Sequence, residues 1–315
     1  MAVADLILPV FAVILTGWMA GYFGYVSRNL SDALIYFAYN IAMPALLLVT
    51  IGQEPARSLL VWRFLIAFGG GSLICFCIVF ILSGRRNGRN AQRQTMYGMA
   101  ASMTNTGFVA LPILRAVYGP HAVLPAAIAT VFVAVVMFPA AVILLEKNRT
   151  YGRTQRATLI RHIVLNPLVL STLLGIVWSA VGVPIPGPVA AYLTIFADAL
   201  TPCALFAIGL GLSLDGMRTD LGSSLVLAAV KLLIMPIVVY GLALACGLDP
   251  LYTIAAVICA AVPTAKTVFI LVGEYKCEEP MVATTIALTT LLSVASLMLW
   301  LYALSGLNSS AAIGN

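Results

Sequence analysis

The sequence has few charged residues. Asp, Glu, Lys and Arg make up 9% of its 315 residues, whereas hydrophobic residues make up 62% and the mean hydropathy is +1.05. Soluble domains carry about 25% charged residues, so this composition excludes a soluble globule and predicts an all-α polytopic membrane protein in contact with the lipid bilayer. The formal net charge of +6 does not indicate a nucleic-acid partner, because the basic residues lie in short loops between apolar runs.

Enzyme and metal-site motifs are also absent. The sequence contains no HExxH, no G-x-x-x-x-G-K-[ST] and no GxSxG. The two histidines, His121 and His162, lie at the ends of apolar runs, and the six cysteines have the spacing of neither a zinc site nor a disulfide framework. We therefore expect no catalysis, no cofactor and no metal.

Long apolar runs dominate the sequence instead. A transmembrane helix needs about 20 apolar residues, and the hydropathy pattern predicts ten of them. The first begins near Leu6 without a basic n-region or a cleavage motif, which is typical of a retained span. The predicted spans are residues 6–26, 33–52, 60–83, 95–118, 121–145, 163–182, 188–212, 220–246, 250–273 and 280–304.

The distribution of basic residues predicts the orientation. Twelve Lys and Arg residues lie in odd-numbered loops, and only Arg57, Arg63 and Arg115 lie in even-numbered loops. The positive-inside rule then places the odd loops in the cytoplasm and both termini on the outside of the inner membrane.

The longest loop, residues 146–162, divides the chain into two sets of five spans, within residues 1–150 and 151–315. An odd number of spans inverts the second half relative to the first. Asn40 and Asp198 occupy matching positions in spans 2 and 7, because each precedes a proline by four residues. The sequence therefore predicts an inverted five-plus-five repeat.

Spans 4 and 9 are each interrupted near the middle by polar residues and proline. Non-helical backbone survives at membrane depth only where protein or a water-filled cavity satisfies it, and a pair of broken spans is typical of a transporter's binding site. These polar side chains would bind a carboxylate or a dehydrated cation, or would only satisfy the broken backbone. The candidate substrate-binding residues are Thr104, Asn105, Thr106, Gly107, Pro112, Pro263, Thr264, Lys266 and Thr267.

Charged residues inside the spans have alternative interpretations. A charge at the bilayer centre costs about 3 kcal/mol, so Lys266 either binds an anion beside a half-helix N-terminus, snorkels or pairs with an acid. Asp198 and Lys231 either form a structural ion pair or, together with Asn40, couple transport to H⁺ or Na⁺. Asn40 and Asp198 could also serve backbone groups that the following prolines release. Gly17, Gly21 and Gly24 are expected to allow close helix packing.

Polarity concentrated at two breaks favours a secondary transporter over a passive anion channel, which needs a continuous polar pore. A membrane enzyme or sensor, and an ion-coupled symporter of another small solute, are the remaining alternatives.

Five ordered motifs resemble the bacterial branch of the auxin efflux carrier family over nearly the whole chain. That family is related to the plant auxin efflux carriers and, in fold, to bile acid sodium symporters. The motifs are LPVFAVILTGWMAGYFGY, NTGFVALP, NPLVLSTLLGIVWSAVGVPIPGPV, ALTPCALFAIGLGL and VPTAKTVFILVGEY.

The resemblance implies a scaffold of helices 1, 2, 6 and 7 and a transport domain of helices 3–5 and 8–10, in which broken helices 4 and 9 cross. It also implies a homodimer and elevator-type movement of small organic anions such as malonate, malate or auxin-like acids. The family's asparagine at the first break maps onto Asn105, and its proline at the second break maps onto Pro263. The plant proteins carry Asn-Pro where this chain has Asn105-Thr106-Gly107 and a later Pro112. They also have a long central loop that this chain lacks.

The inverted repeat brings the two breaks together. We therefore expect Asn105 and Lys266 to contact the transported anion at one site near the membrane midplane.

Overall fold

The computed structural model describes residues 3–27, 29–55, 61–87, 90–146, 165–211 and 220–307. Of these residues 86% are helical, and they contain no strand beyond one isolated bridge. Several helices pass through a π-helical turn, labelled η. The elements are α1 (Val3–Tyr22), α2 (Leu30–Phe37), η1 (Ala38–Ala42), α3 (Met43–Gln53), α4 (Trp62–Phe64), η3 (Leu65–Gly70), α5 (Gly71–Asn87), α6 (Ala91–Ser102), η4 (Thr106–Ala110), α7 (Leu111–Tyr118), the 3₁₀ turn η5 (Pro120–Ala122), α8 (Val123–Phe132), η6 (Val133–Met137), α9 (Phe138–Glu146), α11 (Pro167–Val181), α12 (Gly187–Leu210), α13 (Leu221–Ala229), η7 (Val230–Ile234), α14 (Met235–Ala245), α15 (Pro250–Ala261), α16 (Thr267–Tyr275) and α17 (Glu279–Ala303).

Six helical stretches of the described chain are long and apolar enough to cross a membrane. Four further apolar helices are shorter, and two of these, Thr106–Tyr118 and Pro250–Ala261, adjoin the predicted breaks. The prediction of an all-helical protein with several membrane-spanning helices is thus confirmed, and the ten-span inverted repeat stays a prediction. The six long stretches are Leu30–Gln53, Trp62–Arg85, Pro120–Leu145, Gly187–Leu210, Leu221–Ala245 and Glu279–Leu307.

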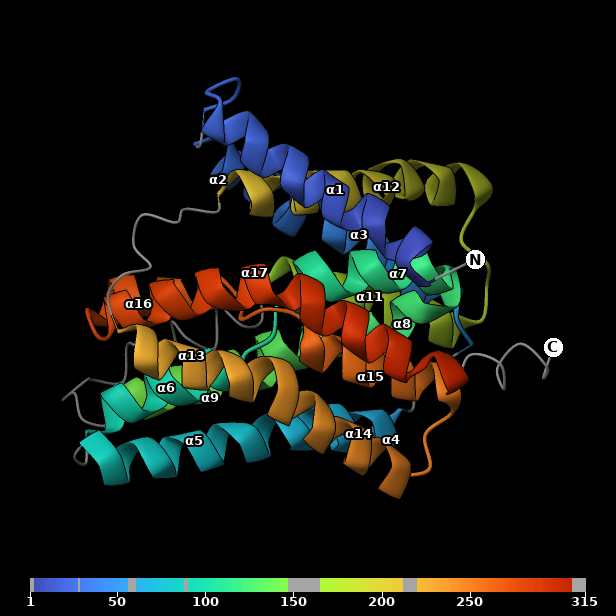
Figure 1. Ribbon diagram of the computed structural model, residues 1–315. Coiled ribbons are helices and arrows are strands. Elements are labelled where there is room, and N and C mark those ends of the chain that lie inside the picture. Colours follow the sequence, from blue (N-terminus) through green and yellow to red (C-terminus); the bar gives the residue numbers. More distant parts are fainter. Residues whose placement is uncertain are drawn as a thin grey trace.

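The helices form two groups, and Figure 1 shows α1, α2, α3 and α12 of the first group in the upper part of the view. In the first group α1, α2 and α3 pack on α12, and α3 also packs on α11. In the second group α5 packs on α6, α13 on α17, α14 on α15, and α8 on both α15 and α7. Each group combines helices from both halves of the chain. The two halves are therefore not separate units in space.

Close backbone contact joins α1 to α12. A Cβ atom added to Gly17 would overlap the carbonyl oxygen of Phe206, and one added to Gly209 would overlap that of Ile14. The predicted packing role of Gly17 is confirmed. The predicted packing role is wrong for Gly24. This residue lies beyond the end of α1 at Tyr22, has a φ of +73°, and has nothing within 4 Å of an added Cβ.

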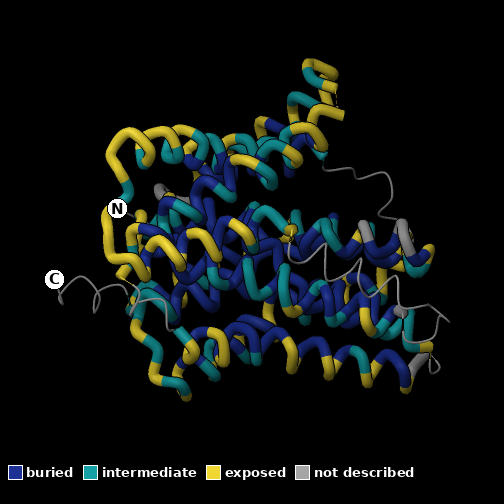
Figure 2. The backbone as a smooth tube through the Cα atoms, turned by 180° about the vertical axis from the view of Figure 1, so that it is seen from behind, coloured by how far each residue is buried: buried dark blue, intermediate teal, exposed yellow. Residues whose placement is uncertain are grey.

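The centre of the molecule holds the short helices. Residues Thr253 to Ala261 of α15 are all buried, as are residues Thr95 to Ser102 of α6. Figure 2 shows this buried centre beneath more exposed outer helices. Because protein surrounds these two helices, their ends can lie within the fold without exposing backbone groups to lipid.

An ion pair ties the start of α6 to the turn between α16 and α17. The guanidinium of Arg93 lies 3.0 Å from the carboxylate of Glu278. Burial raises the pKa of the Glu278 carboxyl, and the neighbouring Arg93 acts against this rise. This contact joins the start of the first interrupted span to the end of the second.

Candidate functional site

Both predicted interruptions are present, and they lie side by side. Helix α6 ends at Ser102 and η4 begins at Thr106, while α15 ends at Ala261 and α16 begins at Thr267. The two non-helical stretches pair in antiparallel fashion at Thr104 and Thr264. The Asn105 N–H donates to the Pro263 carbonyl at 2.9 Å, and the Ala265 N–H donates to the Met103 carbonyl at 3.0 Å. We call this paired stretch, residues 103–105 and 262–266, the crossing.

Pro112 does not contribute to the first break. The helix runs without interruption from Thr106 through η4 and α7 to Tyr118, and Pro112 lies in the first turn of α7. The preceding π-helical turn shifts the hydrogen-bond pattern there, so the missing N–H of proline is tolerated. The prediction that Pro112 interrupts this span is therefore wrong.

The two threonines at the bridge have different roles. The Thr264 hydroxyl donates to the Ala100 carbonyl at 2.7 Å, and its N–H donates to the Thr289 hydroxyl at 3.2 Å. The Thr104 hydroxyl is buried and has no hydrogen-bond partner among the described residues. Thr264 thus satisfies the broken backbone, whereas Thr104 presents an unpaired polar group, which is costly when buried unless a ligand or water binds it.

A cavity of about 740 Å³ lies beside the crossing. Helices of both groups line it, since α2, η1 and the ends of α11 and α12 face the crossing across it. Of the predicted site residues, Thr104, Asn105, Thr106, Gly107, Lys266, Thr267 and Asn40 line this cavity. Pro112, Pro263, Thr264, Asp198 and Lys231 do not.

Lys266 is the only lysine or arginine among the described cavity-lining residues, and Asp32 is the only acid. Lys266 is the N-cap residue of α16 and is partly exposed. Its Nζ reaches toward the end of α12, where a Cβ added to Gly211 would lie 2.6 Å from it. No ion pair to Lys266 is present in the described part of the chain.

The sequence analysis missed five polar cavity residues, namely Asp32, Tyr36, Tyr39, Thr130 and Asn166. The Asn166 side-chain amide donates to the Tyr39 hydroxyl at 2.8 Å, and its oxygen accepts from the Leu168 N–H at 2.9 Å as the N-cap of α11. The sequence Asn166-Pro167 predicts such a cap but not a cavity. Asp32 was not predicted to lie in the site because it precedes the predicted start of span 2.

Asn40 forms a hydrogen bond with the local backbone, as one of its two interpretations from the sequence predicts. Its amide donates to the Tyr36 carbonyl, four residues earlier, at 2.9 Å. This bond lies at the π-helical turn η1, which precedes Pro44. Asn40 also lines the cavity, so its local role does not remove it from the candidate site.

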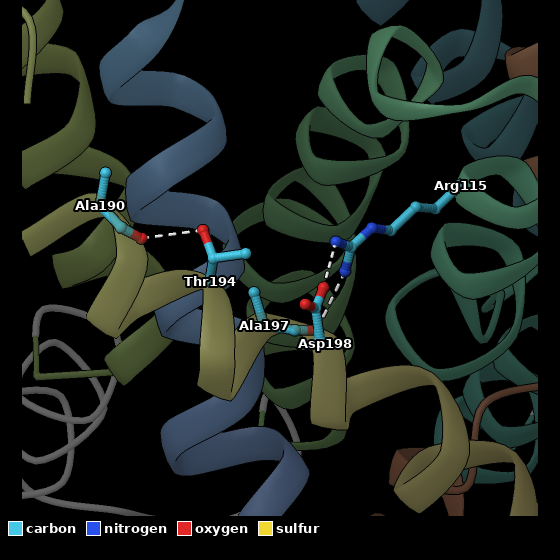
Figure 3. A network of polar contacts seen from close by, with 5 residues as sticks. All are labelled: Arg115, Ala190, Thr194, Ala197 and Asp198. Atoms are coloured by element: carbon cyan, nitrogen blue, oxygen red, sulfur yellow. Dashed lines mark hydrogen bonds and ion pairs between the residues drawn. The ribbon is translucent and has the colours of Figure 1, made fainter. Parts of the chain in front are cut away.

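The predicted ion pair between Asp198 and Lys231 is wrong. Asp198 of α12 pairs instead with Arg115 of α7 at 2.5 Å, and Arg115 also donates to the Ala197 carbonyl at 3.0 Å (Figure 3). Lys231 lies in η7, in the other group of helices, and donates to the carbonyls of Ala260 and Val262. Arg115 was assigned to a loop, yet it lies in the last turn of α7, within reach of α12.

Comparison with known proteins matches residues 2–301 to the family described as "Membrane transport protein". The chain belongs to this family, that of the auxin efflux carriers. It is therefore a membrane transporter.

Relatives of this carrier include bacterial, archaeal and plant proteins. A Rhizobium meliloti (strain 1021) protein named "Putative malonate transporter" is 26% identical over 306 residues, 95% of each chain. An "Uncharacterized transporter" of Methanothermobacter thermautotrophicus is 24% identical over 304 residues, covering 95% of this chain and 98% of that one. "Auxin efflux carrier component 2" of Oryza sativa subsp. japonica is 28% identical over 153 residues, 47% of this chain and 24% of the rice protein.

Proposed function

We propose that this carrier moves small organic anions across the cytoplasmic membrane and binds them in the cavity beside the crossing. The observation that supports this most directly is the position of Lys266, the cavity's only described base, at the N-terminus of a half-helix. The starts of η4 and α16 each carry about half a positive charge, although in the first turn of α16 the N–H groups of Val268 and Phe269 already donate to the carbonyls of Ala265 and Lys266. Together with the unpaired Thr104 hydroxyl, these helix starts suit a carboxylate.

The cavity suits one carboxylate attached to an apolar body better than a dicarboxylate. The described residues of its wall include five aromatic residues, one base and one acid. A second carboxylate, as in malonate, would therefore lack a basic partner and would pay for its lost hydration. We expect an apolar monocarboxylate to bind more tightly than malonate. The aromatic lining residues are Tyr36, Tyr39, Phe108, Phe138 and Phe269.

We further propose an elevator mechanism within a ten-span inverted repeat. The packing of α1, α2, α3, α11 and α12 with one another supports a scaffold, and the location of the cavity between this group and the crossing supports a site that moves against it. A homodimer joined through spans 2 and 7 would hold the scaffold in place, as the family resemblance implies.

The proposed orientation opens the cavity to the cytoplasm. Asp32, Asn166 and Gly211 line the cavity at helix ends that adjoin the basic, odd-numbered loops. Arg115 and Asp198 join the two helix groups outside this cavity. We interpret this pair as a contact that closes the outer side in the inward-open state.

Counterflow in proteoliposomes tests the proposal. Labelled apolar monocarboxylates should exchange faster than malonate or malate, and vesicles with imposed H⁺ or Na⁺ gradients report whether either ion is coupled. If inorganic anions pass and no organic anion does, the channel alternative is correct.

Variants at the crossing test the site itself. Lys266→Ala should raise KM more than Asn105→Ala, because a hydrogen bond to a charged group contributes about 2 kcal/mol and a neutral one about 1 kcal/mol. Lys266→Arg should also transport poorly, since a planar guanidinium does not replace a compact ammonium. Equal KM values in the three variants and the wild type would place the anion elsewhere.

A further inference from the structure

Lys231 is a fully buried lysine that the proposed binding cavity does not use. Its side chain has a relative exposure of 0%, and its Nζ donates to the Ala260 carbonyl at 2.5 Å and to the Val262 carbonyl at 2.7 Å. In the described part of the chain, the ion pairs join Arg93 to Glu278 and Arg115 to Asp198. No described carboxylate therefore neutralises Lys231.

The two carbonyls that Lys231 binds belong to the end of α15, at the crossing. The last four carbonyls of a helix lack intrahelical donors, and the helix C-terminus carries about half a negative charge. An anion bound beside the crossing would be repelled by this negative end. A lysine ammonium at the same carbonyls supplies both their hydrogen bonds and a compensating positive charge.

Among the described residues, no cation binds the carbonyls at the end of α6, the other half-helix that ends at the crossing. At the end of α6, the Ala100 carbonyl accepts from the Thr264 hydroxyl and the Met103 carbonyl accepts from the Ala265 N–H. Both donors are neutral. Neutral donors thus suffice to satisfy carbonyls at this crossing, so the presence of a lysine at the end of α15 requires a separate explanation.

Contacts from α17 fix the turn that carries Lys231. The Ser296 hydroxyl and the Trp300 indole N–H both donate to the Leu232 carbonyl, at 2.9 and 3.0 Å. This carbonyl belongs to η7, whose π-helical pattern leaves it able to accept bonds from outside the helix. The ammonium is therefore held at the end of α15 by the surrounding fold.

We propose that Lys231 is a built-in cation that cancels the negative carbonyl end of α15 and thereby sets the affinity of the crossing for anions. It is a positioning and electrostatic residue and does not touch the substrate. This inference rests on the proposed function, because it assumes that an anion binds at the crossing. It also means that these carbonyls need no dissociable metal cation.

Amine rescue of Lys231→Ala tests the inference. This substitution removes a propylammonium group, so the variant is reconstituted with propylammonium, with 1-propanol or with neither. We expect KM for the transported monocarboxylate to rise about tenfold with little change in the maximal rate, in line with the effect of one charge at a helix end. Propylammonium should restore KM and 1-propanol should not. Equal rescue by both compounds would show that only the lost volume matters.

Two further variants make the result decisive. Leu232→Ala, at the adjacent buried position, empties a similar volume without removing a charge, so propylammonium should leave its KM unchanged. Lys231→Met keeps the volume and removes the charge, and it replaces Lys231→Ala if the alanine variant does not fold. A wild-type KM in Lys231→Met overturns the inference. If the wild-type protein itself moves no organic anion, the proposed function fails instead.

Discussion

Lys266 depends on a glycine across the cavity for its position. A Cβ on Gly211 would approach the Lys266 Nζ to 2.6 Å and the Ser31 hydroxyl to 2.7 Å, so a methyl group there displaces flexible side-chain ends rather than backbone. We predict that Gly211→Ala raises KM severalfold and lowers the melting temperature only slightly, because two side-chain ends have to move, the Lys266 ammonium and the Ser31 hydroxyl that donates to the Ala207 carbonyl. Transport kinetics and thermal unfolding of the purified protein check this.

Gly187→Ala is the matched control for this prediction. It lies at the other end of α12 and has nothing within 4 Å of an added Cβ. Both kinetics and stability of this variant should resemble those of the wild type. A wild-type KM in Gly211→Ala would mean that the position of Lys266 does not govern binding.

The sequence predicted which single residues line the site better than it predicted which residues pair with each other. Asn105 and Lys266 are recognisable because a polar or charged group at membrane depth is costly and is rare outside functional sites. The partners of Asp198 and Lys231 were not recognisable, because opposite charge alone says nothing about which helices face each other. Asp32 and Tyr39 enter the cavity through the packing of α2 and η1, for which the local sequence gives no signal.

The contact between α1 and α12 sets the stability of the first helix group. Because an added Cβ at Gly209 would overlap the carbonyl of Ile14 in the backbone of α1, relief requires the helices to separate. We predict that Gly209→Ala lowers the free energy of unfolding by about 1–3 kcal/mol, the usual cost of overpacking. Thermal unfolding in detergent measures the change.

Gly241→Ala in α14 provides the comparison. Nothing lies within 4 Å of its added Cβ, and alanine is the better helix former by about 1 kcal/mol. This variant should be as stable as the wild type or more so. If Gly209→Ala is equally stable, α1 is free to move against α12, and the first group is not rigid.

The helix breaks could be predicted because their cause is local. Residues that disfavour a helix are visible in the sequence at both breaks. They are the polar residues Thr104 and Asn105 at the first break, and Pro263 followed by Thr264 at the second. Pro112 misled the prediction because a π-helical turn upstream of it keeps the helix continuous. Such turns depend on tertiary packing, so the sequence alone does not indicate them.

The pair formed by Arg115 and Asp198 links the two helix groups of the whole molecule. We predict that Asp198→Asn shifts the protein toward the outward-open state by a severalfold change in population, since a partly exposed ion pair contributes up to about 1 kcal/mol. Labelling of Thr267→Cys by a membrane-impermeant reagent, added from each side in turn, reports the shift, because Thr267 lines the cavity.

The charge-reversed double variant, Arg115→Asp with Asp198→Arg, is the control. It keeps the attraction with the charges exchanged, so it should return labelling toward the wild-type pattern. Unchanged labelling in Asp198→Asn would show that this pair does not influence the conformational equilibrium.

The pairing of residues 103–105 with residues 263–265 also has a consequence for biosynthesis. While the first half of the chain is entering the membrane, the N–H of Asn105 and the carbonyl of Met103 have no partner, because those partners are translated about 160 residues later. Unpaired backbone groups are costly in lipid. The first half therefore depends on the translocation machinery, or on water held around it, until the second half arrives. Completion of the chain, rather than insertion of any one span, is the step that commits this protein to its fold.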